Sequence, residues 1–168
     1  MRNYNIEEYE LYTDGSCVPS IANSYVNYGG WAYYLVKDSN IIAHDKGQIL
    51  KGATNQRAEL IACAEGLKRA KILRRHTERV KVFSNSAYLI NCYLQGWYKN
   101  WMKNGWVNSK GDDVANRELW WELIPFFQDV NYFFEKVKGH ADNFYNNLCD
   151  KDAQEMARDA RSGKIVFR

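Results

Sequence analysis

The hydrophobic pattern of this chain changes its period in a set order, and that order limits the folds available to it. Residues 8–16 alternate between apolar and polar side chains and end at a turn, and residues 29–50 contain two more strands joined at the turn 37–40. Residues 54–73 then place apolar side chains at helical spacing. This first part of the chain predicts a three-stranded antiparallel meander followed by a helix.

The second half of the chain predicts strands that alternate with helices. The predicted elements are a strand at 79–84, a helix at 86–94, a helix at 116–127, a strand at 130–137 and a helix at 143–163. A meander followed by such units gives an α/β fold with a five-stranded mixed sheet flanked by helices. Strands 1–3 are expected to be antiparallel, and strands 1, 4 and 5 parallel. We expect one domain over residues 1–168, with a short leader at 1–8 and a tail at 162–168.

Composition excludes several classes of protein. The chain has 168 residues, no apolar run of bilayer length and a polar, acidic beginning without the pattern of a signal peptide. Its four cysteines have neither zinc-binding nor CxxC spacing, so we expect reduced thiols and a cytoplasmic protein.

Positive charge is concentrated in residues 68–81, which carry seven Lys or Arg against one Glu, whereas the whole chain has a net charge of only +3. Such a patch can bind phosphate. An equally weighted interpretation is a helix C-terminus whose cations complement the helix dipole.

Polar side chains fall at comparable places in several of the predicted elements. Asp14 is expected to close the first strand and Asn85 the fourth, Glu59 lies on the first long helix and Asp150 on the last one. Adjacent parallel strands end at one edge of a sheet, where crevices form. Carboxylates gathered there repel one another unless a cation neutralises them, and Mg²⁺ prefers such oxygen ligands. Taken singly, each acid also has an ordinary explanation as a turn or surface residue.

Four strings resemble the motifs of type 1 ribonuclease H. They are YTDGS, TNQRAEL, SNS after an apolar strand, and KGHAD followed by NNLCDKDA, in the family's order from about Tyr9 to Ala160. The resemblance implies a ribonuclease H-like fold. It also implies an endonuclease that hydrolyses the RNA strand of RNA–DNA hybrids and leaves 5′-phosphate and 3′-hydroxyl ends.

The resemblance further assigns roles to residues. Asp14, Glu59, the residue at 85 and Asp150 match the set that binds two Mg²⁺ ions, for which Mn²⁺ may substitute in the family, and His140 matches a mobile histidine that assists proton transfer or product release. The expected partner is an RNA–DNA hybrid, bound by a monomer without any membrane association.

Position 85 departs from the family, because relatives carry Asp where this chain has Asn. Asparagine is nearly isosteric with aspartate but brings no charge. We therefore interpret the chain as an inactivated or strongly impaired form. In this interpretation the Asp→Asn change is deliberate and lets the protein hold its substrate without cutting it. A natural inactive homologue is the other explanation of Asn85.

Substrate contacts are also implied by the family match. Asn55, Gln56 and Glu59 match residues that face the RNA minor groove, Thr54 and Asn116 match a DNA phosphate pocket, and an arginine of that pocket falls at Gly52, where Lys51 is a possible substitute. A DNA channel is matched by Tyr88, Trp97 and Trp101, for which core packing is the alternative. An RNA-contacting Asn falls in the 17–28 loop, at Asn23 or Asn27. A weakly basic protrusion is matched by residues 100–111, whose neighbourhood carries Lys99, Lys103 and Lys110.

Three alternatives remain at this point. The chain can be a non-catalytic hybrid-binding module that has lost one acid, another nuclease of the same fold such as a resolvase or integrase core, or the ribonuclease H domain of a reverse transcriptase.

Overall fold

A computed structural model gives the structure of the protein, and it describes residues 8–137 and 143–166. Five strands and five helices make up these ranges. The strands are β1 (Glu8–Pro19), β2 (Asn27–Lys37), β3 (Asn40–Ile49), β4 (Arg79–Ser84) and β5 (Tyr132–Lys136). The helices are α1 (Asn55–Leu73), α2 (Ala87–Gln95), α3 (Trp97–Asn104), α4 (Arg117–Phe127) and α5 (Phe144–Arg161).

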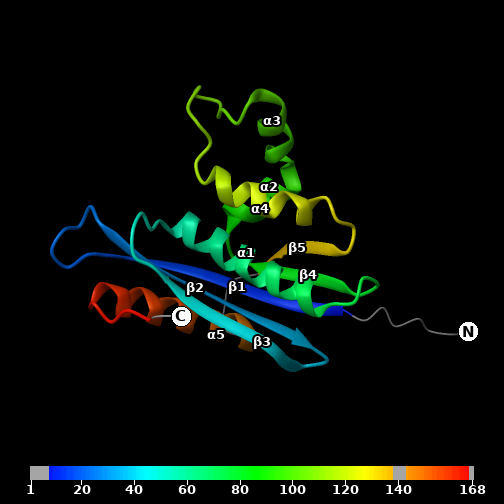
Figure 1. Cartoon of the computed structure of the whole chain (residues 1–168), viewed down its shortest axis with the longest axis horizontal. Helices are drawn as coiled ribbons and strands as arrows, with labels where there is room; N and C mark the ends of the chain where they lie inside the picture. Colours follow the sequence, from blue (N-terminus) through cyan, green and yellow to red (C-terminus); the bar gives the residue numbers. More distant parts are fainter. Residues whose placement is uncertain (1–7, 138–142, 167–168) are drawn as a thin grey trace, which may run out of the picture.

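The strands form one mixed sheet in the order β3-β2-β1-β4-β5. β1, β2 and β3 pair antiparallel, whereas β4 lies parallel to both β1 and β5. This arrangement confirms the predicted fold class, with β1 and β4 adjacent at the centre. α1 and α5 both pack along β1 and β2, and α4 lies beside α1 over the β4–β5 half of the sheet (Figure 1).

Two buried clusters occupy the two faces of the sheet. The larger one joins Leu11 of β1 to α1, α2 and α4, and includes the fully buried Trp120. The smaller one joins Tyr12, the next residue of β1, to Cys149 and Ala153 of α5. Since side chains alternate between the faces of a strand, β1 is held from both sides.

Turn chemistry explains one hairpin and corrects the prediction for the other. Asp38 and Ser39 both have positive φ, 50° and 64°, which is the conformation of a tight two-residue hairpin turn at the predicted place. The predicted loop at 17–28 was too long, because β1 continues to Pro19, which pairs with Asn27 at the start of β2. The continued antiparallel pairing satisfies backbone groups that a loop would leave to solvent.

The helix α3 was not predicted. It follows α2 directly, with Gly96 at φ 67° between the two helices and Gly105 at φ 79° at its end. Both glycines adopt the left-handed conformation that ends helices. α3 projects beyond α4, away from the sheet (Figure 1). None of the helices in the described ranges combines the length and apolar character needed to cross a bilayer.

A close approach between β1 and α1 fixes the position of the predicted acids. A Cβ at Gly15 would lie 2.3 Å from the carbonyl carbon of Ala58 and 2.4 Å from the nitrogen of Glu59. A Cβ at Gly30 of β2 would lie 2.0 Å from the carbonyl oxygen of Ala153 in α5. Glycine at these two positions lets the helices that carry Glu59 and Asp150 lie directly on the sheet.

We expect Gly15→Ala to lower the free energy of unfolding by roughly 3 kcal/mol, because the added methyl group meets backbone rather than a movable side chain. Gly163→Ala is the control. Gly163 has φ 79° and open space around it, so the change there should cost only about 1 kcal/mol of backbone strain. Urea denaturation of both variants measures the difference, and equal losses would contradict the close contact.

Candidate active site

Asp14 lies inside β1 rather than at its end, which corrects one detail of the prediction. The parallel pairing of β1 with β4 nevertheless stops at Tyr12 and Phe83, so Asp14 projects just past the end of β4. Asn85 directly follows β4, and Glu59 lies in the second turn of α1. The edge at which β4 ends therefore carries the predicted residues of three elements.

Asp14 and Glu59 form a buried carboxyl pair. Asp14 is 2% exposed, and its Oδ1 accepts a hydrogen bond of 2.9 Å from the nitrogen of Gly15. Burial is the main cause that raises the pKa of Asp14 to about 6. Burial also raises the pKa of Glu59 well above its usual range, and the neighbouring charge of Asp14 adds to this effect. The charge of Asp14 thus opposes the ionisation of Glu59, whereas a hydrogen bond from Glu59 favours the ionised form of Asp14.

Glu59 also has an unsatisfied oxygen. Its Oε2 is shielded from solvent and has no hydrogen-bond partner. A buried acceptor without a partner is costly in a native structure, and a role as ligand to a cation is one of the explanations for it.

Asp150 stands beside this pair on α5. Asn143 caps that helix by accepting a hydrogen bond of 2.9 Å from the nitrogen of Asn146, which orients the first turn. Asp150 is exposed, and both of its carboxylate oxygens accept from Nε2 of Gln154 at 3.1 Å. Its negative charge contributes to the raised pKa of both Asp14 and Glu59, so the three acids share one electrostatic site.

Two serines hold the strand-to-helix junction that presents Asn85. The nitrogen of Ser86 donates to Oγ of the buried Ser84 at 3.1 Å, and Oγ of Ser86 caps α2 by accepting from the nitrogen of Leu89 at 3.2 Å. Asn85 is exposed between them. The junction is thus fixed while the amide faces solvent. His140, the fifth predicted catalytic residue, lies outside the described residues.

The chemistry of this donor set fits a hard divalent cation. Carboxylate and amide oxygens are available at Asp14, Glu59, Asn85 and Asp150, and the unpartnered Oε2 of Glu59 is a further oxygen suited to a cation. Across the described ranges, however, no group of three or more His, Cys, Asp or Glu side chains is already gathered closely enough to hold a metal. The acids are close enough to affect one another's pKa, but in the described residues they do not form a group of three that could hold a metal.

The predicted phosphate pocket is organised by a residue that the sequence analysis did not single out. Oγ1 of Thr54 caps α1 by accepting from the nitrogen of Arg57, and Nη1 of Arg57 donates to Oδ1 of Asn116 at 3.2 Å. Arg57 also pairs with Glu118. Arg57 therefore joins Thr54 and Asn116, with its charge paired to Glu118. Its place in the TNQRAEL string was the available signal.

The beginning of α1 is open to a ligand. Asn55 and Gln56 are exposed, and the first turn of α1 contains no acidic residue. A helix N-terminus carries partial positive charge and free backbone N–H groups, so this end of α1 favours phosphate or other anions.

The predicted aromatic channel is a cluster of mutually tilted rings that lies partly over the core. Tyr88 is 6.3 Å from Trp97 between ring centroids, and Trp97 is 6.3 Å from Trp101. Beneath them lies Trp120, which is 0% exposed and whose Nε1 donates to Oη of Tyr88 at 3.3 Å. The three predicted residues are half-buried and pack against the core, as the alternative interpretation expects, while their contact with DNA stays a prediction. Trp97 and Trp101 also line a surface hollow of about 460 Å³ with Asn100.

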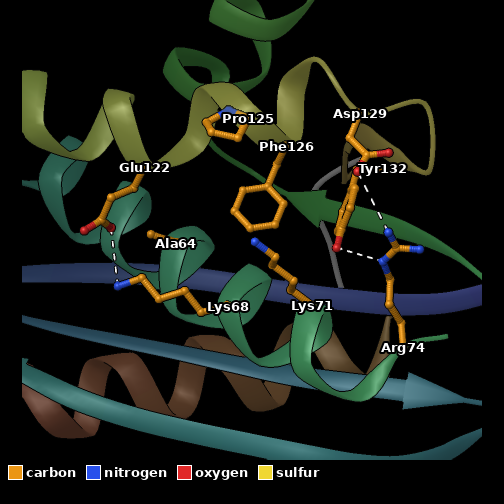
Figure 2. Close-up of a pocket in the computed structure, with 9 residues that line it drawn as sticks. All are labelled: Ala64, Lys68, Lys71, Arg74, Glu122, Pro125, Phe126, Asp129 and Tyr132. Carbon is orange, nitrogen blue, oxygen red and sulfur yellow. Dashed lines mark hydrogen bonds and ion pairs between the residues drawn. The ribbon is translucent and has the colours of Figure 1, made fainter. Parts of the chain in front are cut away.

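The basic segment 68–81 serves mainly the fold. Figure 2 shows the pocket that it lines between α1 and α4, where Arg74 bonds Oη of Tyr132 at 2.9 Å and pairs with Asp129 at 3.8 Å. Lys68 pairs with Glu122 at 3.4 Å. None of the predicted acids lines this pocket, which has a volume of about 300 Å³. Three cations of the segment, Lys68, Arg74 and Lys81, are thus paired with acidic side chains of the protein itself.

The raised pKa values predict how stability changes with pH. The native state holds protons on Asp14 and Glu59 up to a higher pH than the unfolded chain does, so their contribution to stability falls as pH rises from about 4 through 6. We expect Asp14→Asn to raise the free energy of unfolding by roughly 1–3 kcal/mol at pH 7.5 and to change it little at pH 4. Urea denaturation at the two pH values measures this.

Asp112→Asn, in an exposed loop, is the control and should leave stability similar at both pH values. A less stable Asp14→Asn protein at pH 7.5 would contradict the strained carboxyl pair.

Comparison with known proteins identifies the family. The RNase H family profile matches residues 6–158. Ribonuclease H of Caldanaerobacter subterraneus subsp. tengcongensis is 39% identical over 158 residues, which cover 94% of this chain and 95% of that protein. Ribonuclease H of Syntrophomonas wolfei is 40% identical over 159 residues, which cover 92% and 97%.

Solved structures share the fold at lower identity. The PFV RNase H domain superposes with a TM-score of 0.74 at 22% identity, over 90% of this chain and 95% of that domain. LC11-RNase H1, solved in complex with an RNA/DNA hybrid, gives a TM-score of 0.64 at 21% identity, over 90% and 98%. From the profile match and the two bacterial relatives, the chain belongs to the RNase H family.

Proposed function

We propose that this protein binds RNA–DNA hybrids and that its site is built to hydrolyse the RNA strand, leaving 5′-phosphate and 3′-hydroxyl ends. The observation that carries the proposal is the buried Asp14–Glu59 pair with its unpartnered Oε2, placed beside Asp150 in a chain of this family. The ribonuclease H relatives and the hybrid complex of LC11-RNase H1 support the choice of substrate.

Mg²⁺ would be held by Asp14, Glu59, Asp150 and the carbonyl oxygen of Asn85. Two such ions, with Mn²⁺ as a possible substitute, would supply charge neutralisation and activation of water for attack on phosphorus. The protein's own part is to present carboxylates that lose their protons when positive charge arrives. The raised pKa of Asp14, about 6, makes that proton release occur close to neutral pH.

Asn85 limits this chemistry. An amide oxygen can contact a cation, but it brings no negative charge, and the described acids already fail to gather as a group of three. We infer that the chain as it stands binds hybrid with impaired cleavage. A non-catalytic hybrid-binding protein is the second candidate, and Asn85 is the observation that favours it.

The substrate would lie across the start of α1. Asn55 and Gln56 offer amide donors and acceptors to the 2′-hydroxyl groups of the RNA strand, in the shallow groove where RNA is recognised. Thr54, Arg57 and Asn116 offer a phosphate site for the DNA strand. The role of His140 in proton transfer or product release stays part of the proposal.

We expect Asn85→Asp to raise the rate of hybrid cleavage in Mg²⁺ by at least about 100-fold, because it restores a charged ligand at the exposed junction. Gel analysis of an end-labelled RNA strand measures the rate. Asn40→Asp, which adds the same charge at the β2–β3 turn, is the control and should leave the rate unchanged.

An Asn85→Asp protein that binds hybrid but leaves RNA intact in both Mg²⁺ and Mn²⁺ would favour the non-catalytic function. Cleavage by the unmodified chain at the rate of Asn85→Asp would instead contradict the impairment.

The aromatic cluster predicts a separation between binding and stability. Trp97→Ala should weaken hybrid binding by roughly 1–3 kcal/mol, because a half-exposed ring offers its face to a nucleotide. Trp120→Ala should instead cost about 3–5 kcal/mol of unfolding free energy, since that ring is 0% exposed. A urea melt and a hybrid titration on each variant decide the point. If Trp97→Ala loses stability and keeps its affinity, Trp97 belongs to the core.

A further inference from the structure

The tip of the β1–β2 hairpin exposes apolar side chains that the site described above does not use. Residues 20–26 connect the two strands and extend to one end of the molecule (Figure 1). Tyr25 is 95% exposed and Ile21 is 83% exposed. Single exposed apolar residues are ordinary, but here Val26 and, across from the tip, Leu50 are also exposed. They form a local apolar surface.

The tip is held in one conformation. The nitrogen of Ser20 donates to the carbonyl oxygen of Val26 at 2.7 Å, and the nitrogen of Val26 donates to the carbonyl oxygen of Asn23 at 3.0 Å. Oδ1 of Asn23 accepts from the nitrogen of Tyr25, also at 3.0 Å. Asn23, one of the two predicted RNA-contacting residues of this loop, thus uses its side-chain oxygen to fix the turn. Tyr25 is presented to solvent from a turn closed by these bonds.

A groove joins the tip to the start of α1. It has a volume of about 400 Å³, and its walls are residues 25–27 on one side and 50–54 on the other. Thr54 belongs to this wall and is also the N-cap of α1. Asn27, the other predicted RNA contact, lines it as well. The groove is therefore continuous with the surface proposed for the hybrid.

The charges around this groove suit a polyanion. No Asp or Glu occurs between Asp14 and Asp38, and none occurs between Asp45 and Glu59, although the chain has 20 acidic residues. Lys51 lines the groove itself. None of the residues that line the groove is a carboxylate, which would repel the phosphates of a duplex.

We propose that the hairpin tip is a second binding arm for the hybrid, in which the ring of Tyr25 packs against the duplex beyond the nucleotides held at Asn55 and Gln56. This inference rests on the proposed function and adds a contact that lengthens the bound segment. Tyrosine offers a flat apolar surface at little cost in side-chain entropy, and the ordered turn reduces the cost of binding further.

The length of the arm sets its reach. Five residues separate Asp14 from Pro19 in β1, which spans about 16 Å in an extended strand. At about 3.4 Å per base pair, this distance corresponds to roughly five base pairs of duplex. Hybrids that extend this far from the acids toward the tip should gain the contact, and shorter ones should lack it.

The experiment measures affinity against hybrid length. Labelled hybrids of 6 to 24 base pairs are titrated by fluorescence anisotropy with the unmodified chain, Tyr25→Ala, Tyr25→Phe and the control Val130→Ala. Val130 is 82% exposed and lies in the turn before β5, away from the hairpin. Since Tyr25 is 95% exposed, its replacement leaves the fold intact, and a thermal melt verifies this.

We expect Tyr25→Ala to weaken binding of the longest hybrid at least about fivefold, while Tyr25→Phe and Val130→Ala retain affinity. Affinity should rise with hybrid length and then level off. For Tyr25→Ala it should level off at a hybrid length about five base pairs shorter than for the unmodified chain. Equal affinities of the unmodified chain and Tyr25→Ala at every length would overturn the arm and leave the proposed function standing. Failure of the unmodified chain to bind any hybrid would overturn both.

Discussion

The site depends on the contact between the backbones of β1 and α1 at Gly15. A single methyl group there would lie 2.4 Å from the nitrogen of Glu59, so only glycine allows the helix to approach this closely. The approach brings the half-buried Glu59 beside the buried Asp14, with Oε2 of Glu59 shielded from solvent. Burial then raises the pKa of both carboxyl groups, and the charge of Asp14 raises that of Glu59 further. The electrostatic character of the site follows from this one packing constraint.

That character opposes stability and favours cation binding. Because the native state raises the pKa of both carboxyl groups, the free energy of unfolding falls as pH rises from about 4 through 6. A divalent cation would remove the repulsion and fill the position next to Oε2 of Glu59. Binding sites commonly carry this kind of local instability, because the ligand supplies what the protein alone lacks. Asn85 has the opposite effect to a third carboxylate. Because its amide is uncharged, it adds no repulsion between acids and less attraction for a cation.

The sheet was predictable because its determinants are local. Alternation defined the strands, Asp38 and Ser39 marked their turn, and helices between parallel strands determined the strand order. The helix α3 was missed although Trp97 and Trp101 have helical spacing, because the glycines at both of its ends are typical of a loop. The hairpin extension to Pro19 was missed because proline, serine and asparagine are frequent in loops.

The site was predictable by kind but not by geometry. The order of the motifs indicated Asp14, Glu59, Asn85 and Asp150. The parallel pairing of β1 and β4 does place Asp14 and Asn85 at one edge of the sheet. The bond between Arg57 and Asn116 depends on how α1 and α4 pack, and the burial of Glu59 Oε2 depends on the contact at Gly15. Both arise from tertiary structure, which spacing along the chain does not specify.

The central claim is that the Asp14–Glu59 pair has raised pKa values and that binding of a divalent cation lowers them, releasing protons to solvent. Carbon-13 NMR titration of the side-chain carboxyl groups, with and without Mg²⁺, tests this directly. The account predicts a pKa of about 6 for Asp14 and a strongly raised pKa for Glu59 without Mg²⁺, and a lower pKa for both with it. Ordinary pKa values for both groups, unchanged by Mg²⁺, would contradict it.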